Sequence, residues 1–341
     1  MAQTDKQQTP TRAKRGPVIA CIGGGTGLST LLRGLKTATC EITAIVAVTD
    51  DGGGSGVLRD ELGMPPPGDI RNCMQALSNA EPTIERLLDY RFEGGSLKGQ
   101  SFGNLFLAAI NGISESFDKA VIRMGEVLSI TGRVLPVSND DLHLRAEFAD
   151  GSSITGESKI AAAKKERRSR ISRVALEPAG ARALPACIDA LDKADMIIMG
   201  PGSLYTSIMP NLLVDGITAA IARSHAVKLY VCNVMTEPGE TDGYSVSDHV
   251  KALFDHTGVR LFDYCLVNSE PAPPAILERY MKDGAAPVRD YADDPCPPGV
   301  EVRKAPVAAV SGDLARHDPE KLTREIIRIF YEKAPTKRYG E

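Results

Sequence analysis

The chain has 341 residues, a formal net charge of −4, and 43 % hydrophobic and 25 % charged residues, which is typical of a soluble globular protein. This length exceeds what one small core supports, so it favours one large α/β domain with an embellishment, or two domains. Nucleic-acid binding is excluded as the main activity, because that activity normally leaves a basic footprint. No apolar run approaches the roughly 20 residues needed to cross a bilayer.

Cysteine usage and the start of the chain indicate a cytoplasmic protein. Seven scattered cysteines include no Cys-x-x-Cys pair, which disfavours a disulfide framework or a zinc site and favours a reducing compartment. The five histidines show no metal-ligand spacing. Residues 1–16 are basic without a following apolar segment, so we expect a disordered tail there, not a signal peptide. Residues 17–335 are then expected to form one domain, and the sequence leaves homo-oligomer formation open.

Strand and helix patterns alternate along most of the chain. A parallel sheet covered by helices on both faces is the usual outcome of such alternation, and the continuous apolar run at 41–49 is typical of a strand buried on both sides. The expected strands are 17–22, 41–49, 194–199, 227–234 and 262–269. The expected helices are 28–37, 68–80, 81–92, 103–113, 117–130, 212–224, 245–256 and 319–333.

The pattern changes between about 131 and 160. Short alternating runs at 132–138, 142–148 and 152–158 are separated by turn-forming residues, which predicts a small antiparallel β insertion. The charged run at 164–170 that follows is interpreted as an exposed, solvated loop, with an anion-collecting role as the alternative.

The first expected strand ends in a glycine loop made of Gly23, Gly24, Gly25, Thr26 and Gly27. Glycine permits tight turns and lets main-chain N–H groups approach a phosphate at a helix start. The dinucleotide fingerprint G-x-G-x-x-G and the phosphate loop ending in Gly-Lys-Ser/Thr both fail here. A phosphate-binding loop of another kind is predicted, and a tight structural turn is the alternative.

A pair of acids follows the second expected strand. Asp50 and Asp51 precede three glycines, and Mg²⁺ prefers one or two carboxylates completed by substrate phosphates. We therefore interpret the pair as a candidate Mg²⁺ site. Capping of a turn or helix by these aspartates is the alternative.

Two further loops add candidate ligand groups. Arg71 and Asn72 lie in the first turn of an expected helix, where an arginine can bridge a phosphate. A solvent-facing arginine without a ligand is the alternative. A bare turn after the strand at 194–199 carries hydroxyls and a ring that could stack on a ligand. These candidates are Gly200, Gly202, Ser203 and Tyr205, and Asn233 ends the next strand. Because a helix terminus contributes only about 0.3–1 kcal/mol to an anion and micromolar binding needs about 8 kcal/mol, the loops must cooperate.

Several motifs that occur in a fixed order along the chain identify a resemblance. "IGGGTGLSTLLRGLK", "DDGGGSGVLR", "PPGDIRN", "GPGSLYTS", "PNLLV" and "CNVMTEPGETDGY" resemble the gluconeogenesis factor (YvcK-like) family, relatives of 2-phospho-L-lactate transferase, over about residues 17–330. The resemblance implies a Rossmann-like, CofD-like α/β fold with a doubly wound, mostly parallel sheet. It also implies a cytoplasmic protein needed for cell shape and for growth on gluconeogenic carbon sources.

The resemblance further implies a ligand and site residues. Members bind UDP-sugars, notably UDP-N-acetylglucosamine, with no established reaction, and Tyr280 and Arg316 stand where the family places a site tyrosine and a site arginine. In the transferase relatives, the acids matching Asp50 and Asp51 help to hold Mg²⁺ and a deazaflavin acceptor.

Three functions follow as hypotheses. The first is a nucleotide-sugar-binding regulatory protein, favoured because phosphate-suited loops occur without a recognisable nucleophile or base. The second is a Mg²⁺-dependent transferase of the phospholactate kind. The third is a nicotinamide-dependent oxidoreductase, which the missing third glycine and the doubled acid disfavour.

Overall fold

The computed structural model describes residues 16–166 and 169–334. In this part of the chain, seven parallel strands form one sheet in the order β10-β9-β8-β7-β1-β2-β3. The strands are β1 (Ile19–Gly23), β2 (Ile42–Val46), β3 (Arg133–Pro136), β7 (Met196–Met199), β8 (Val227–Val231), β9 (Tyr264–Asn268) and β10 (Glu301–Ala305).

The strand order reverses between β1 and β7. From β1 the chain proceeds through β2 to β3 at one edge, and from β7 it proceeds through β8 and β9 to β10 at the other. Cys21 on β1 therefore has Ala44 of β2 on one side and Ile198 of β7 on the other. In open α/β sheets the crevice at such a switch point is where ligands bind.

The central strands are buried on both faces. Every residue of β1, β2 and β7 is buried, because helices cover the sheet on both sides. The expectation of a continuous apolar strand at 41–49 is thus confirmed for its central part. The predicted doubly wound α/β class is confirmed as well.

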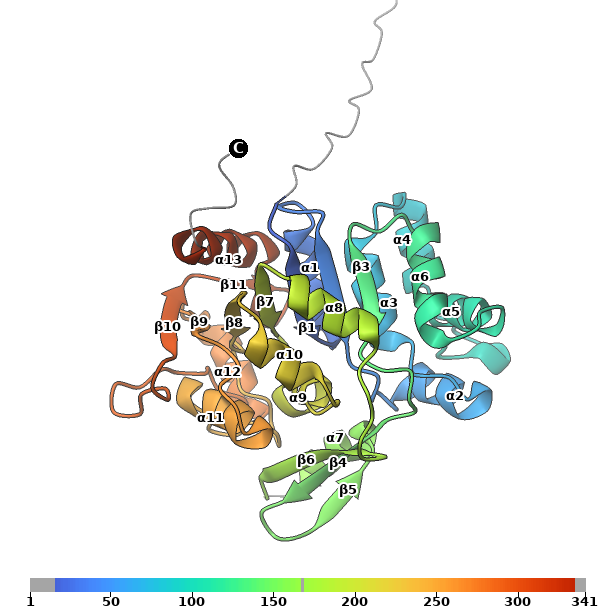
Figure 1. Cartoon of the computed structure of the whole chain (residues 1–341). Coiled ribbons are helices and arrows are strands. Elements are labelled where there is room, and N and C mark those ends of the chain that lie inside the picture. Colours follow the sequence, from blue (N-terminus) through green and yellow to red (C-terminus); the bar gives the residue numbers. More distant parts are fainter. Residues whose placement is uncertain (1–15, 167–168, 335–341) are drawn as a thin grey trace, which may run out of the picture.

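Two helical layers enclose the sheet. Helix α1 (Gly25–Leu35) packs on α3 (Gly68–Leu77) and α13 (Pro319–Lys333), whereas α8 (Pro185–Lys193) packs on α10 (Ile217–Arg223). Figure 1 shows α8 and α10 in front of the sheet. Right-handed crossovers that run in opposite directions from the switch point place their helices on opposite faces. The other helices are α2 (Gly53–Leu62), α4 (Pro82–Asp89), α5 (Phe102–Gly112), α6 (Phe117–Val127), α9 (Met209–Leu212), α11 (Val246–Thr257) and α12 (Pro274–Lys282).

A small antiparallel sheet lies below the main body in Figure 1. It consists of β4 (His143–Phe148), β5 (Ser153–Thr155) and β6 (Ile171–Glu177) in the order β5-β4-β6, with α7 (Glu157–Glu166) attached. The predicted antiparallel β insertion is thus confirmed, but its bounds differ from the expected 131–160 at both ends. β3 pairs parallel with β2 in the main sheet, since three successive residues of it are buried, and the insertion extends to Glu177.

Three features of the chain depart from the sequence pattern. The expected helix over 212–224 is divided into α9 and α10, and Gly216 between them has a φ of 100°. Helix α2 forms where only a glycine loop was expected. A β-hairpin of β11 (Ala308–Ser311) and β12 (Leu314–His317) precedes α13 and was not predicted.

Some expectations fall on residues outside the described ranges. The tail expected over 1–16 lies there almost entirely, and the charged run at 164–170 includes residues 167–168 and side chains that the structure does not describe. Within the described residues, no helix combines the length and the apolar character that a membrane span requires.

Candidate functional site

The first glycine loop leads directly from β1 into α1. Helix α1 begins at Gly25, whose φ is 63°, and no side chain caps it from Gly24. The first N–H groups of a helix lack partners inside the helix. One of them is already used, because the Gly25 N–H donates to the Asp69 carboxylate. The N–H groups of Thr26 and Gly27 follow it in the first turn.

The two glycine loops touch each other across the switch point. A Cβ atom on Gly27 would lie 2.5 Å from the Pro201 carbonyl oxygen, and one on Gly24 would lie 2.5 Å from an oxygen of Asp69. Side chains at either position would therefore separate elements that are in direct contact. This packing explains the glycine-rich sequence of the first loop as well as a bound ligand would.

Side-chain amides fix the second loop against the first. The Gly202 N–H donates to Asn233 Oδ1 at 3.3 Å, so the end of β8 holds the loop that follows β7. Asn211 Nδ2 donates to the Gly23 carbonyl at 3.0 Å and to the Ser207 carbonyl at 2.8 Å. The loops after β1, β7 and β8 are thus joined by hydrogen bonds at one edge of the sheet.

The hairpin of β11 and β12 covers this edge of the sheet. Tyr280, on α12, is bonded to it twice: its hydroxyl donates to the Ala315 carbonyl at 3.3 Å and accepts from the Ala315 N–H at 3.2 Å. Arg316 and His317 follow on β12. Burial lowers the pKa of His317 to about 4, although its hydrogen bond to the Cys232 backbone opposes that shift. The ring is therefore neutral at pH 7.

These elements enclose a hollow that we call the switch-point cleft, with a volume of about 350 Å³. Its wall contains hydroxyls, amides, main-chain groups and the Arg316 guanidinium, and no carboxylate is among the residues that line it. The lining residues are Gly24, Gly25, Thr26, Gly27, Thr30, Pro201, Gly202, Ser203, Ser207, Asn233, Val234, Met235, Tyr280, Leu314, Ala315, Arg316 and His317.

Nine of the residues singled out in the sequence therefore lie on one wall, drawn from five separate segments. They are Gly24, Gly25, Thr26, Gly27, Gly202, Ser203, Asn233, Tyr280 and Arg316. Ser207, one of the hydroxyls in the turn after β7, lies there too, whereas sequence reasoning missed Thr30 and His317. Thr30 lies one helical turn beyond Thr26, so the i, i+4 spacing of α1 was a usable signal.

Tyr205 does not serve as a stacking platform, which corrects the expectation from sequence. It is only 2 % exposed, and its hydroxyl is 2.9 Å from that of Tyr244. Its ring contacts the His256 ring on α11. The irregular helical turn at Leu204–Ile208 directs this ring into the core. Gly23 ends β1 and Gly200 directly follows β7, and neither of them lines the cleft.

Arg71 and Asn72 also lie away from the cleft, contrary to expectation. Arg71 is buried, and its Nη1 is 3.4 Å from Asp89 at the end of α4. A Cβ atom on Gly103 would lie 2.5 Å from Arg71 Cδ, so the side chain passes beneath α5. The guanidinium therefore joins α3 to α4 and α5, and cannot bridge a phosphate in the cleft.

Acidic side chains gather on the other side of the first glycine loop. Burial raises the pKa of Asp69 to about 6, and the nearby Asp50 carboxylate adds to this rise. Burial also raises the pKa of Asp50, and it raises the pKa of Glu157 well above the usual range, with Asp50 and Asp69 contributing. Glu157 begins α7 of the insertion, far away in sequence, so no local pattern revealed it.

The Asp50–Asp51 pair is held mainly by the main chain. Asp50 Oδ1 accepts the Gly52 N–H at 2.9 Å, and Asp51 Oδ1 accepts the Ser158 N–H at 2.7 Å. Within the described residues, no three Asp, Glu, His or Cys side chains are arranged to hold a metal ion. A magnesium ion here would need oxygens from a bound ligand or from water, which Mg²⁺ commonly uses.

Known proteins resemble this chain over most of its length. The sequence model of the family described as 2-phospho-L-lactate transferase CofD matches residues 19–308. A putative gluconeogenesis factor of Thermoanaerobacterium thermosulfurigenes is 55 % identical over 92 % of this chain and 97 % of its own. The gluconeogenesis factor of Bacillus subtilis is 48 % identical over 93 % and 99 %, respectively.

Solved structures agree with the sequence comparisons. The crystal structure of a protein of the UPF0052 family from Bacillus halodurans superimposes with a TM-score of 0.86 at 47 % identity, covering 90 % of this chain and 98 % of that one. Both the fold and the resemblance noted from the sequence motifs are thus confirmed.

Proposed function

The chain belongs to the CofD family, and we propose that it is a regulatory protein that binds a nucleoside-diphosphate sugar in the switch-point cleft. The observation that supports this most directly is the composition of the cleft wall. Two glycine loops present main-chain groups to the same hollow as Arg316, and no carboxylate is among its lining residues. Such a surface favours an anion that can accept several hydrogen bonds at once.

The energetics favour a diphosphate over a single phosphate. One helix terminus contributes about 0.3–1 kcal/mol, whereas a micromolar complex needs about 8 kcal/mol. The cleft combines the start of α1, the Gly202–Ser203 turn, the Asn233 amide and the Arg316 guanidinium. Two linked phosphate groups could contact more of these groups than one can, and the attached nucleoside and sugar would add contacts.

The proposed role is to report ligand supply. A protein that binds a UDP-sugar such as UDP-N-acetylglucosamine without consuming it can signal how much cell-wall precursor the cytoplasm contains. This agrees with the name gluconeogenesis factor, which the relatives carry, and it connects to the role in cell shape that the resemblance implies.

Titration calorimetry tests the proposal. Wild-type protein should bind UDP-N-acetylglucosamine, and Arg316→Ala should weaken binding roughly tenfold to a hundredfold, because hydrogen bonds to a charged group contribute about 1.5–3 kcal/mol. Arg324→Ala, at an exposed position on α13, is the matched control and should bind normally. Absence of heat at millimolar ligand would contradict the proposal, and so would equal weakening by both variants.

A transferase of the phospholactate kind is the second candidate, and the acidic cluster beside the first glycine loop favours it. In that case, Mg²⁺ held near Asp50 and Asp51 would neutralise charge on the diphosphate bridge of the donor, whose P–O–P bond breaks as the phospholactyl group moves to the acceptor hydroxyl and a nucleoside monophosphate leaves. The protein itself would orient the donor through the loops and Arg316. Product formed from a deazaflavin acceptor and a guanylyl-phospholactate donor, and lost in Asp51→Asn, would establish this activity. No product with wild-type protein would dismiss it.

A further inference from the structure

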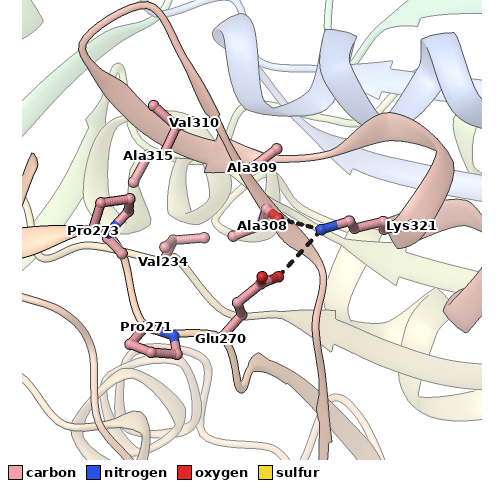
Figure 2. A pocket seen from close by; sticks show the side chains of 10 residues that line it. Val234, Glu270, Pro271, Pro273, Ala308, Ala309, Val310, Ala315 and Lys321 are labelled. Atoms are coloured by element: carbon pink, nitrogen blue, oxygen red, sulfur yellow. Dashed lines mark hydrogen bonds and ion pairs between the residues drawn. The ribbon is translucent and has the colours of Figure 1, made fainter.

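A second hollow adjoins the switch-point cleft on the far side of the hairpin. We call it the hairpin pocket, and its volume is about 300 Å³. Val234 and Ala315 line both hollows, so the two are neighbours across these residues. Figure 2 shows the hairpin pocket with Ala308, Ala309 and Val310 along one wall.

The hairpin pocket differs chemically from the cleft. Its walls are small and saturated, formed by alanine, valine and proline side chains, and its polar groups are the Glu270 carboxylate and the Lys321 ammonium. Lys321 Nζ is 3.2 Å from Glu270 and donates to the Ala308 carbonyl at 3.1 Å. A phosphate would meet a negative carboxylate here, so the diphosphate of the ligand belongs in the cleft.

We propose that the hairpin pocket is the glycosyl subsite of the nucleoside-diphosphate sugar, with Glu270 accepting hydrogen bonds from the sugar hydroxyls. This inference rests on the proposed function and specifies which end of the ligand the pocket takes. A hexose presents several O–H donors to a carboxylate, which only accepts hydrogen bonds. A uracil presents one N–H donor and two carbonyl acceptors, and no aromatic ring or guanidinium lines the pocket to stack on a planar base.

Glu270 has acceptor capacity to spare. An ionised carboxylate offers about four lone-pair sites, and among the described residues the Glu270 carboxylate accepts one hydrogen bond, from Lys321. Half of the Glu270 side chain and 39 % of the Lys321 side chain are exposed. Such an exposed ion pair contributes little to stability, so hydroxyl groups can share the carboxylate at low cost.

Hydrogen bonds hold together the two backbone segments that carry Glu270 and Ala308 of the pocket. At the end of β9, Asn268 Oδ1 accepts the Glu270 N–H at 3.3 Å and the Val307 and Ala308 N–H groups at 3.2 Å each. Its Nδ2 donates to the Glu270 carbonyl at 2.6 Å. One amide therefore fixes the carboxylate-bearing loop relative to the hairpin, and a preorganised site loses less entropy on binding.

The combined size of the two hollows also suits such a ligand. Pockets for compact organic ligands measure about 300–1,000 Å³, and the cleft alone, at about 350 Å³, lies near the lower limit. A nucleoside diphosphate with a hexose needs more room than that. The hairpin pocket supplies the additional volume on the side where hydroxyl acceptors are available.

The experiment compares UDP with UDP-N-acetylglucosamine by calorimetry on the full chain. Wild-type protein should bind the sugar nucleotide more tightly than UDP. Glu270→Gln should remove most of this preference, a loss of roughly tenfold in sugar-nucleotide affinity, and leave UDP affinity unchanged. Ala309→Leu, which fills the pocket without touching its charges, should do the same.

The matched control is Glu301→Gln, which removes a carboxylate from a comparable exposed pair with Lys333, at 3.4 Å, outside both hollows. It should bind both ligands normally, and thermal melts would establish that all variants fold. Equal losses for UDP and UDP-N-acetylglucosamine in Glu270→Gln would overturn the inference, as would a wild-type protein without preference for the sugar. Failure of wild type to bind either ligand would instead overturn the proposed function itself, and the subsite with it.

Discussion

The two sides of the first glycine loop carry opposite chemistry. On one side lies the switch-point cleft, with Arg316, amides and hydroxyls and no lining carboxylate. On the other side lie Asp50, Asp69 and Glu157, whose pKa values are raised mainly by burial and, for Asp69 and Glu157, also by neighbouring carboxylates. The same helix start serves both, because Asp69 accepts the Gly25 N–H as an internal anion. The remaining first-turn groups are left for an external anion.

Glycine in the first loop meets two separate steric requirements. Gly24 makes room for the Asp69 carboxylate, and Gly27 makes room for the Pro201 carbonyl of the second loop. Neither requirement involves a ligand. The loop is therefore shaped first by its protein neighbours, and the proposed ligand would contact only the groups that this packing leaves exposed.

The strongest test of this view is Gly27→Ala. A methyl group 2.5 Å from the Pro201 oxygen must push the two loops apart, so the free energy of unfolding should fall by about 3 kcal/mol, and ligand binding should be lost. Gly112→Ala, at the end of α5 where a Cβ meets nothing within 4 Å, is the control. Urea denaturation measures both variants, and equal stabilities would contradict the packing explanation.

Asp69→Asn tests the acidic side. The folded-state pKa of Asp69 is raised to about 6 from 3.8, so the folded protein holds this proton more tightly than the unfolded chain does. The contribution of Asp69 to the free energy of unfolding is fully present below about pH 4 and is lost as the pH rises through 6. An asparagine still accepts the Gly25 N–H and carries no charge. The variant should be more stable than wild type by about 2 kcal/mol at pH 8.

The pH dependence distinguishes this cause from a general effect. Urea titrations at pH 4, 5, 6 and 8 should show the two proteins converging at the acidic end and diverging above it. A constant difference across all four pH values would mean that the Asp69 charge is not responsible. Such a result would remove the electrostatic contrast between the two sides of the loop.

The smallest expected effects separate the two tyrosines. Tyr205→Phe removes one hydroxyl contact, with Tyr244, and should lower stability by about 1 kcal/mol without changing ligand affinity. Tyr280→Phe removes both bonds to Ala315 and should weaken binding of UDP-N-acetylglucosamine while changing the melting temperature little. Titration calorimetry measures the ligand affinity of both variants. Weaker binding by Tyr205→Phe would show that the Tyr205 ring belongs to the binding site after all.

The sheet and its switch point could be predicted because they depend on local signals. Buried parallel strands are continuous apolar runs, and β1, β2 and β7 show this plainly. Loops that follow parallel strands emerge at the carboxyl edge of the sheet. The convergence of the two glycine loops could therefore be predicted, because each loop directly follows an expected strand. Tyr280 and Arg316 were predicted as site residues only through the family resemblance.

The remaining features depend on contacts that no local pattern encodes. β3 is as short as an insertion strand, and only its pairing with β2 assigns it to the main sheet. Tyr205 follows a glycine turn as a ligand-binding ring would, yet an irregular helical turn directs it inward. Glu157 reaches the acidic cluster because the insertion folds back on the main body, with its α7 N–H at Ser158 bonded to Asp51.

The hairpin that carries Arg316 lies almost entirely beyond residues 19–308, the range that the CofD sequence model matches. It is attached through the Tyr280 hydroxyl on α12 and the Asn268 side chain at the end of β9, and its two strands form a separate sheet. The hairpin over this edge can therefore differ in sequence without altering the strands beneath it. Descendants of one ancestral fold could acquire new ligand preferences by exchanging this short segment alone.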